Sequence, residues 1–158
     1  MKQFVEVATR LVGIESVTTA GTENLANYLS VLMQARGLSV QTQEVRHSVE
    51  GVSQRQFNVL GVLGDPLVDR KTRKGLLLMS HIDTATPGAL AHWTEGRKSP
   101  FHLHVDNGVM TGLGVADSKL SFLCQLEAVS LLRDAKFKVP VYLAGTCGEE
   151  MGAFGAKY

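Results

Sequence analysis

The sequence has few cysteines and prolines, and neither sign of charge dominates it. Two cysteines and four prolines occur among its 158 residues. Two cysteines are too few for a disulfide scaffold, which favours a reducing compartment such as the cytoplasm. The 16 Lys and Arg residues nearly balance the 15 Asp and Glu residues. The chain therefore lacks the basic excess that is typical of nucleic-acid-binding proteins.

Long apolar runs are also missing. The longest, residues 75–79, is far shorter than the roughly 18 residues that a membrane span needs. Glu6 and Arg10 interrupt the N-terminal segment, which therefore lacks the apolar core of a signal peptide. Because 44% of the residues are hydrophobic and 20% are charged, we expect a cytoplasmic globular chain without membrane or nucleic-acid partners.

The hydrophobic pattern predicts an α/β domain with a mainly parallel sheet flanked by helices. Thr22 and Gly37 are predicted to bound the second helix, as its N-cap and its C-terminal glycine. The apolar run over 75–80 predicts a strand buried on both faces. The other predicted elements are helices over 2–13 and 118–134, an edge strand over 38–45, strands over 57–63 and 140–145, a polar loop over 65–74, and a hairpin over 101–112 that turns at 106–108.

The last seven residues, 152–158, carry no helix stop signal and no polar tail. The sequence therefore ends where a further helix is expected to begin. We expect residues 1–158 to be the N-terminal part of a longer domain, and the 158-residue chain to associate through an unfilled sheet edge.

Polar side chains that can bind a metal follow three predicted elements. His81 and Asp83 come directly after the strand over 75–80, and their spacing places them on one side of an extended backbone. Asp117 precedes the third helix, and Glu149 and Glu150 follow the strand over 140–145. Ligands gather beyond the carboxyl ends of strands in such sheets. One imidazole with several carboxylates suits zinc, manganese or cobalt.

Each of these signals also has an ordinary structural explanation. A histidine at a strand end is often a hydrogen-bonded surface group, Asp117 suits an N-cap, and paired glutamates suit the start of a helix. The glycines at 112 and 114 are weak support for a dinucleotide site, because the third glycine of that motif is replaced by Asp117.

Three motifs, in this order and spacing, resemble the N-terminal motifs of one metallohydrolase family. They are Ser-His-Ile-Asp-Thr at 80–84, Gly-Leu-Gly-Val-Ala-Asp-Ser-Lys at 112–119, and Gly-Thr-Cys-Gly-Glu-Glu-Met-Gly at 145–152. The family contains acetylornithine deacetylases, succinyl-diaminopimelate desuccinylases, aminoacylases, dipeptidases and glutamate carboxypeptidases. The resemblance covers nearly the whole chain. Its motifs are specific for the family but say little about the substrate.

The resemblance implies a role for each motif residue. His81 would bind one of two metal ions, zinc first, and Asp83 would orient its imidazole. Asp117 would bridge both ions, Glu150 would bind the second, and Glu149 would act as the general base. The implied reaction is hydrolysis of the amide bond of an N-acyl amino acid or a small peptide, by a protein that forms a homodimer in its complete form.

The chain also departs from the family pattern. Leu113 stands where a basic or polar residue is common, and Ser118-Lys119-Leu120 replaces Met-Lys-Gly. A further acidic ligand, a late histidine and the lid domain of the family have no counterpart in these 158 residues. The alternative is therefore a truncated or degenerate copy that is not catalytic and binds a metal weakly.

Three other residues receive predictions from their local sequence. Lys119 is expected to be a solvated helix residue, and Cys124, within an apolar stripe, is expected to lie in the core. Trp93, among polar neighbours, is a candidate for the rim of a pocket.

Overall fold

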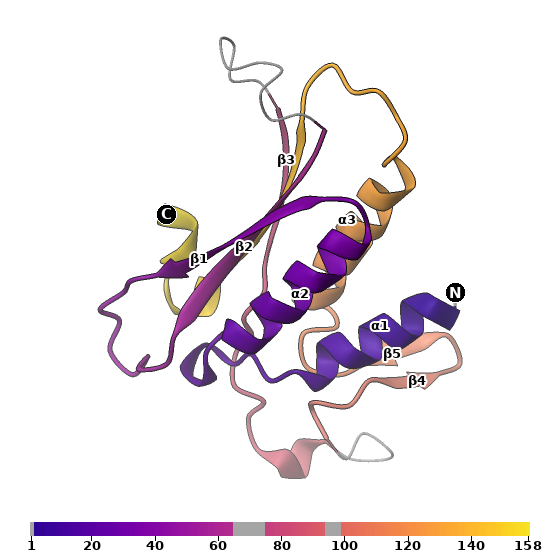
Figure 1. Cartoon of the computed structure of the whole chain (residues 1–158). Coiled ribbons are helices and arrows are strands. Elements are labelled where there is room, and N and C mark those ends of the chain that lie inside the picture. Colours follow the sequence, from indigo (N-terminus) through magenta and orange to yellow (C-terminus); the bar gives the residue numbers. More distant parts are fainter. Residues whose placement is uncertain (1, 65–74, 94–98) are drawn as a thin grey trace.

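The computed structural model describes residues 2–64, 75–93 and 99–158 (Figure 1). The polar loop predicted over 65–74 lies outside the described residues. Every other predicted helix and strand is present, with ends shifted by a few residues at most. The helices are α1 (Lys2–Gly13), α2 (Glu23–Ala35) and α3 (Lys119–Leu131), the strands are β1 (Ser39–Val45), β2 (Gln56–Leu63), β3 (Leu76–His81), β4 (His104–Asp106), β5 (Val109–Thr111) and β6 (Val141–Thr146), and the 3₁₀ turns are η1 (Thr18–Ala20), η2 (Leu90–His92), η3 (Glu149–Met151) and η4 (Gly155–Lys157).

The main sheet is mixed, with the strand order β1-β2-β6-β3. The α/β architecture is as predicted, but only β3 and β6 pair in parallel, whereas β1–β2 and β2–β6 are antiparallel. The direction of each pair follows partly from its connection. A loop over residues 46–55 joins β1 to β2 and returns the chain in the opposite direction, while the crossover from β3 to β6 contains α3 and allows parallel pairing.

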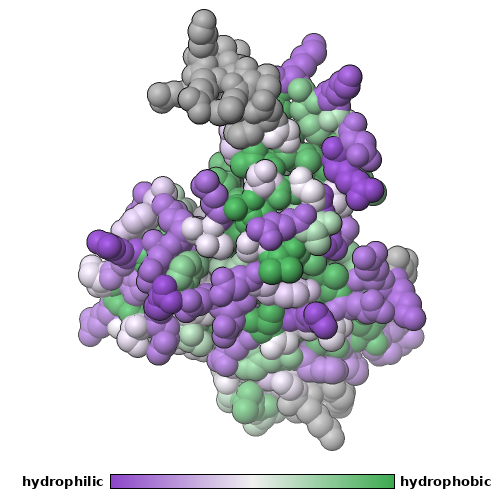
Figure 2. Space-filling model, in the orientation of Figure 1, coloured by the Kyte–Doolittle hydropathy of each residue, from purple (hydrophilic) through white to green (hydrophobic). Residues whose placement is uncertain are grey.

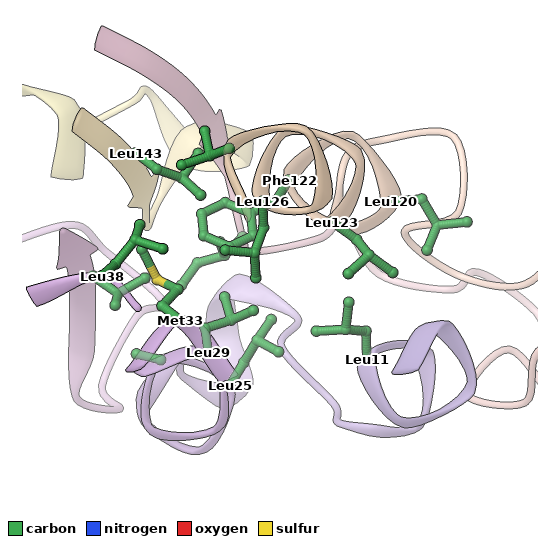
Figure 3. Close-up of a cluster of buried hydrophobic side chains, with 14 of the residues drawn as sticks. Leu11, Leu25, Leu29, Met33, Leu38, Leu120, Phe122, Leu123, Leu126 and Leu143 are labelled. Carbon is green, nitrogen blue, oxygen red and sulfur yellow. The ribbon is translucent and has the colours of Figure 1, made fainter. Parts of the chain in front are cut away.

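A hydrophobic core fills the space between the helices and one face of the sheet (Figure 3). Met33 of α2 reaches the sheet at Gly61, where an added Cβ atom would lie 2.3 Å from the methionine Cε. A larger residue at this position would have to displace the ends of the Met33 and Leu38 side chains. The largest buried apolar side chains are Leu11, Leu25, Leu29, Met33, Ile82, Phe122, Leu123, Leu126 and Leu143.

Strand β3 is not buried on both faces, contrary to prediction. It is an edge strand of the described sheet and pairs only with β6. The side chains of Leu76, Leu77 and Met79 are more than half exposed, at 53%, 56% and 52%. The apolar run predicts two covered faces, but the described part of the chain leaves no residue of β3 fully buried. In Figure 2, patches of green hydrophobic residues lie below the upper group of grey atoms, interrupted and bordered by hydrophilic ones.

Two predictions for residues of α3 are wrong. Lys119 is buried, and its Nζ donates hydrogen bonds to the carbonyl oxygens of Leu11 (3.0 Å) and Ile14 (2.6 Å) at the end of α1. It thereby satisfies carbonyls that have no partner within their own helix. Cys124 is exposed. Because α3 is apolar around much of its circumference, its pattern does not indicate which side faces the core.

The hairpin β4–β5 turns at Asn107 and Gly108, as predicted. Both residues have positive φ, at 46° and 80°, which is the conformation that Asn-Gly turns favour between antiparallel strands. No helix within the described ranges is long and apolar enough to cross a membrane.

Candidate metal centre

The candidate site lies at the carboxyl ends of β3 and β6, the parallel pair of the sheet. His81 is the last residue of β3 and is the register partner of Thr146, the last residue of β6. The segments that follow both strands therefore leave the sheet side by side. This is the edge at which the sequence predicted that the acidic residues and the histidine gather.

Asp83 lies behind the site with its side chain fully buried. Its Oδ2 accepts hydrogen bonds from the Thr18 hydroxyl (2.7 Å) and the Glu150 N–H (3.3 Å), and its Oδ1 accepts one from the Glu149 N–H (3.2 Å). Burial acts to raise the pKa of Asp83, but the interactions with His81, Thr18 and the two N–H groups outweigh it and lower the pKa. Asp83 is therefore stabilised as an ionised carboxylate inside the fold.

The His81 imidazole lies between Asp83 and the more exposed acidic residues. Its Nδ1 is 3.1 Å from the Asp83 carbonyl oxygen and 3.6 Å from the Asp83 Oδ1. Its Nε2 is 2.8 Å from Asp117 Oδ1 and 3.9 Å from Glu149 Oε2. The Asp83 carboxylate, with Asp117 next in effect, raises the pKa of His81 to about 9, although burial acts in the opposite direction. The carboxylates around His81 therefore create a negative electrostatic potential, which favours a positive charge in the site.

Asp117 lies in the loop that leads into α3, and its side chain is 75% exposed. Its hydrogen-bond partner is His81, and the N-cap of α3 is Ser118 rather than Asp117. The Ser118 hydroxyl donates to the carbonyl oxygen of His81, which ties this loop to the end of β3. The peptide bond between Asp117 and Ser118 is cis.

Glu149 and Glu150 form the turn η3, which a small aromatic cluster supports. Gly148 and Gly152 flank this turn with left-handed φ angles of 70° and 98°. The Phe154 ring occupies the space of a side chain at position 148, because a Cβ atom there would lie 2.2 Å from the ring. His47 stacks on the Phe154 ring, with 4.8 Å between the ring centroids. The glutamate turn is therefore packed against the loop that follows β1.

The structure brings together all five residues that the sequence singled out. One potential ligand atom from each of His81, Glu149 and Glu150 lies within 4.8 Å of the others. Asp117 joins them through its contact with His81, and Asp83 lies behind. Within the described part of the chain, no Lys or Arg forms an ion pair with Asp117 or either glutamate. A divalent cation would relieve the mutual repulsion of these carboxylates, and nitrogen and oxygen donors suit zinc, cobalt or manganese.

Sequence reasoning missed the N-terminal contribution to this site. The segment after α1 runs beside the residues that follow β3, with Val17 and Thr84 in a parallel bridge. The Thr18 hydroxyl donates to the Asp83 carboxylate, whereas the Ser16 hydroxyl donates to the backbone carbonyl of Ile82 and contacts none of the five site side chains. These contacts join residues about 65 positions apart, and no local motif marks either hydroxyl.

A cavity of about 480 Å³ lies beside the loop that carries Asp117. Trp93 lines it, in agreement with its prediction as a rim residue, and the indole N–H donates to the Pro87 carbonyl oxygen (3.0 Å). The other described lining residues are Pro87, His92, Met110, Thr111, Gly112, Val115 and Ala116. Ala116 is the residue directly before Asp117, so the cavity adjoins the candidate metal centre.

A comparison with protein families matches residues 77–158 to a family described as "Peptidase family M20/M25/M40". The match spans all of β3 but its first residue, together with α3, β6 and all five site residues. Among curated proteins, the acetylornithine deacetylases of Proteus mirabilis and Yersinia pestis are each 30% identical to the chain over 161 aligned residues. Each alignment covers 98% of the chain but only 38% and 39% of the respective deacetylase. The chain thus spans about two fifths of the length of these relatives.

Solved structures share the fold over nearly the whole chain. Human carnosine dipeptidase 1 superposes with a TM-score of 0.73 at 20% identity, covering 98% of this chain and 33% of the dipeptidase. The dipeptidase Dug1p of Saccharomyces cerevisiae gives the same TM-score at 22% identity, covering 98% of this chain and 34% of its own. At these identities, the likeness establishes the fold alone.

Proposed function

The chain belongs to peptidase family M20/M25/M40, and from this premise we propose that it is the N-terminal part of a metal-dependent amide hydrolase. The proposed substrates are N-acyl amino acids or small peptides, in keeping with relatives named as deacetylases and dipeptidases. The single observation that carries the proposal is the convergence of His81, Glu149 and Glu150 at one sheet edge, with Asp117 against the same imidazole.

We propose that His81 would hold one of two metal ions, Glu150 would hold the other, and Asp117 would contribute to both. Zinc is the first candidate, with cobalt or manganese as alternatives, because the donors are one imidazole nitrogen and several carboxylate oxygens. When bound, such ions lower the pKa of water and polarise the amide carbonyl. The interaction of Asp83 with Nδ1 leaves Nε2 of His81 directed at Asp117, on the side where the ions would bind.

Glu149 is proposed as the general base. Its side chain is half exposed, and its carboxylate lies 3.9 Å from His81 Nε2, so it reaches the site while remaining open to substrate. In this role it takes a proton from the attacking water and passes it to the leaving amine. The backbone N–H of Glu149 is held by Asp83, which fixes the turn from which the carboxylate extends.

The cavity beside Asp117 is proposed to receive one end of the substrate. Its walls combine the apolar side chains of Trp93, Met110 and Val115 with the His92 imidazole and the Thr111 hydroxyl. Apolar walls with a few polar groups are typical of small-molecule sites.

The test is Glu149→Ala in the longer hydrolase that contains this chain. We expect turnover of N-acyl amino acids or dipeptides to be lost while the zinc content, measured by atomic absorption, stays close to that of the wild type. Glu150→Ala is the matched variant, because it removes the neighbouring carboxylate and is expected to lower the zinc content. Full activity in Glu149→Ala would show that another group is the base.

A second function, metal binding without catalysis, is supported by the composition of the cluster. One imidazole and three carboxylates are few ligands for two ions, and these are the residues of the described chain that converge here. Zinc titration of the 158-residue chain distinguishes the two functions. One weakly bound ion supports a site that needs further ligands, and two tightly bound ions show that this chain alone completes it.

A further inference from the structure

We propose that Thr18 is a positioning residue for the metal centre, acting on His81 through the Asp83 carboxylate. The inference rests on the proposed function, since it takes His81 as a metal ligand and Asp83 as the group that orients it. It adds a segment at the N-terminal side of the fold, distant in sequence from all three motifs, to the parts that build the site.

The two oxygens of Asp83 have different partners. Oδ1 faces His81 Nδ1 at 3.6 Å and accepts the Glu149 N–H. Oδ2 accepts the Thr18 hydroxyl at 2.7 Å and the Glu150 N–H at 3.3 Å. Thr18 therefore holds the oxygen that does not face the imidazole, and its short bond opposes rotation of the carboxylate. That restraint keeps Oδ1 directed at His81.

Thr18 is itself fixed on every side. It is 2% exposed, its N–H donates to the Thr84 carbonyl (3.1 Å), and its own carbonyl accepts from the Gln56 Nε2 (2.7 Å). Because its backbone is held in this way, the Thr18 hydroxyl has a fixed position beside the Asp83 carboxylate. Among the described residues, it is the one hydroxyl that donates to Asp83.

Ser16 provides a matched control two residues earlier in the same segment. Its side chain is also buried, and its hydroxyl donates to the Ile82 carbonyl at 2.9 Å. Ser16→Ala thus removes a buried hydrogen bond next to Asp83 in sequence, but it does not change the partners of the Asp83 carboxylate. A general loss of packing would affect both variants, whereas a positioning role affects only Thr18.

The experiment measures Zn²⁺ affinity of the 158-residue chain by competition with a chromophoric chelator, and the visible absorption of bound Co²⁺. We expect Thr18→Val to weaken Zn²⁺ binding about 10-fold, the low end of the effect of residues that hold a metal ligand in place. We expect its Co²⁺ spectrum to shift and Thr18→Ser to restore both properties. Ser16→Ala is expected to lower the thermal midpoint while leaving affinity and spectrum unchanged.

Each other outcome has a defined meaning. If Thr18→Val does not fold, Thr18→Ser and Thr18→Ala replace it as a pair that differs by a single oxygen atom, and equal affinities in that pair overturn the inference. Wild-type affinity in Thr18→Val alongside weakened binding in Asp83→Asn refutes the role of Thr18 alone. A wild-type chain that binds no Zn²⁺ refutes the proposed metal site, and the inference with it.

Discussion

Asp83 and Asp117 contact opposite sides of one imidazole in entirely different surroundings. Asp83 is fully buried, and one hydroxyl and two backbone N–H groups donate to its carboxylate. Asp117 is 75% exposed, and its partner is His81. The buried carboxylate is bound by the fold, whereas the exposed one remains available to a ligand. One site thus combines a carboxylate that stabilises the fold with one that is available to bind a ligand.

The largest expected effect is the loss of stability on removing the buried carboxylate. Asp83→Ala leaves the Thr18 hydroxyl and two backbone N–H groups without their acceptor and removes the negative charge beside His81, and we expect it to lower the free energy of unfolding by about 3–5 kcal/mol. Urea denaturation measures this change. Because the pKa of Asp83 is lowered in the fold, its contribution is present above its ordinary pKa of 3.8 and is lost as the pH falls below that value.

Asp117→Ala is the control for that measurement. Exposed residues of this kind change the free energy of unfolding by no more than about 0.5 kcal/mol. Equal losses in the two variants would abolish the distinction between a structural and an available carboxylate.

The second largest effect concerns Lys119, a buried group of opposite charge whose partners are neutral carbonyls. Burial lowers the pKa of Lys119 from 10.5 to about 8, so the folded state releases its proton before the unfolded state does. The stability of the wild type should therefore rise relative to Lys119→Met between pH 8 and 10.5, by on the order of 3 kcal/mol.

Urea denaturation of both proteins across this pH range gives the difference directly. Parallel pH profiles for the two proteins would show that the Lys119 ammonium is not destabilised by its surroundings. The contrast between Asp83, whose charged form is stabilised by its partners, and Lys119, whose charged form is destabilised by burial, would then not hold.

The third effect is on metal binding rather than stability. Asp117→Ala removes a proposed ligand, and we expect Zn²⁺ affinity to fall by at least about 100-fold, equivalent to about 2.7 kcal/mol. Chelator competition on the 158-residue chain provides the measurement, with Asp106→Ala in the β4–β5 turn as an exposed-carboxylate control. Unchanged affinity would remove Asp117 from the proposed ligand set.

The helices, the hairpin and the location of the site were predictable because their signals are local. The alternation of apolar residues, the Asn107-Gly108 turn and the acidic residues after each strand are all visible within short windows of sequence. Strand β3 was mispredicted because its apolar run specifies two covered faces, while burial depends on what packs there. The mixed direction of the sheet depends on strand order, which no single segment encodes.

The environments of the site residues were less predictable than their identities. Lys119 follows the predicted ligand Asp117 closely, yet its partners Leu11 and Ile14 are more than 100 residues away. Thr18 is likewise joined to Asp83 only by the folded chain. A hydroxyl or ammonium group donates to whichever acceptor the tertiary structure places beside it. Its role therefore follows from the fold and not from its neighbours in sequence.

The central position of β6 has a consequence for synthesis. β6 lies between β2 and β3, but among the described strands it is the last to leave the ribosome, and the turn carrying Glu149 and Glu150 follows it. At translation rates of about 5–20 residues per second, β3 leaves the ribosome several seconds before β6, its only described strand partner. During that interval, the apolar side chains of Leu77 and Met79 belong to a nascent chain whose sheet is still open. Chaperone capture at this stage is expected to depend on these two side chains.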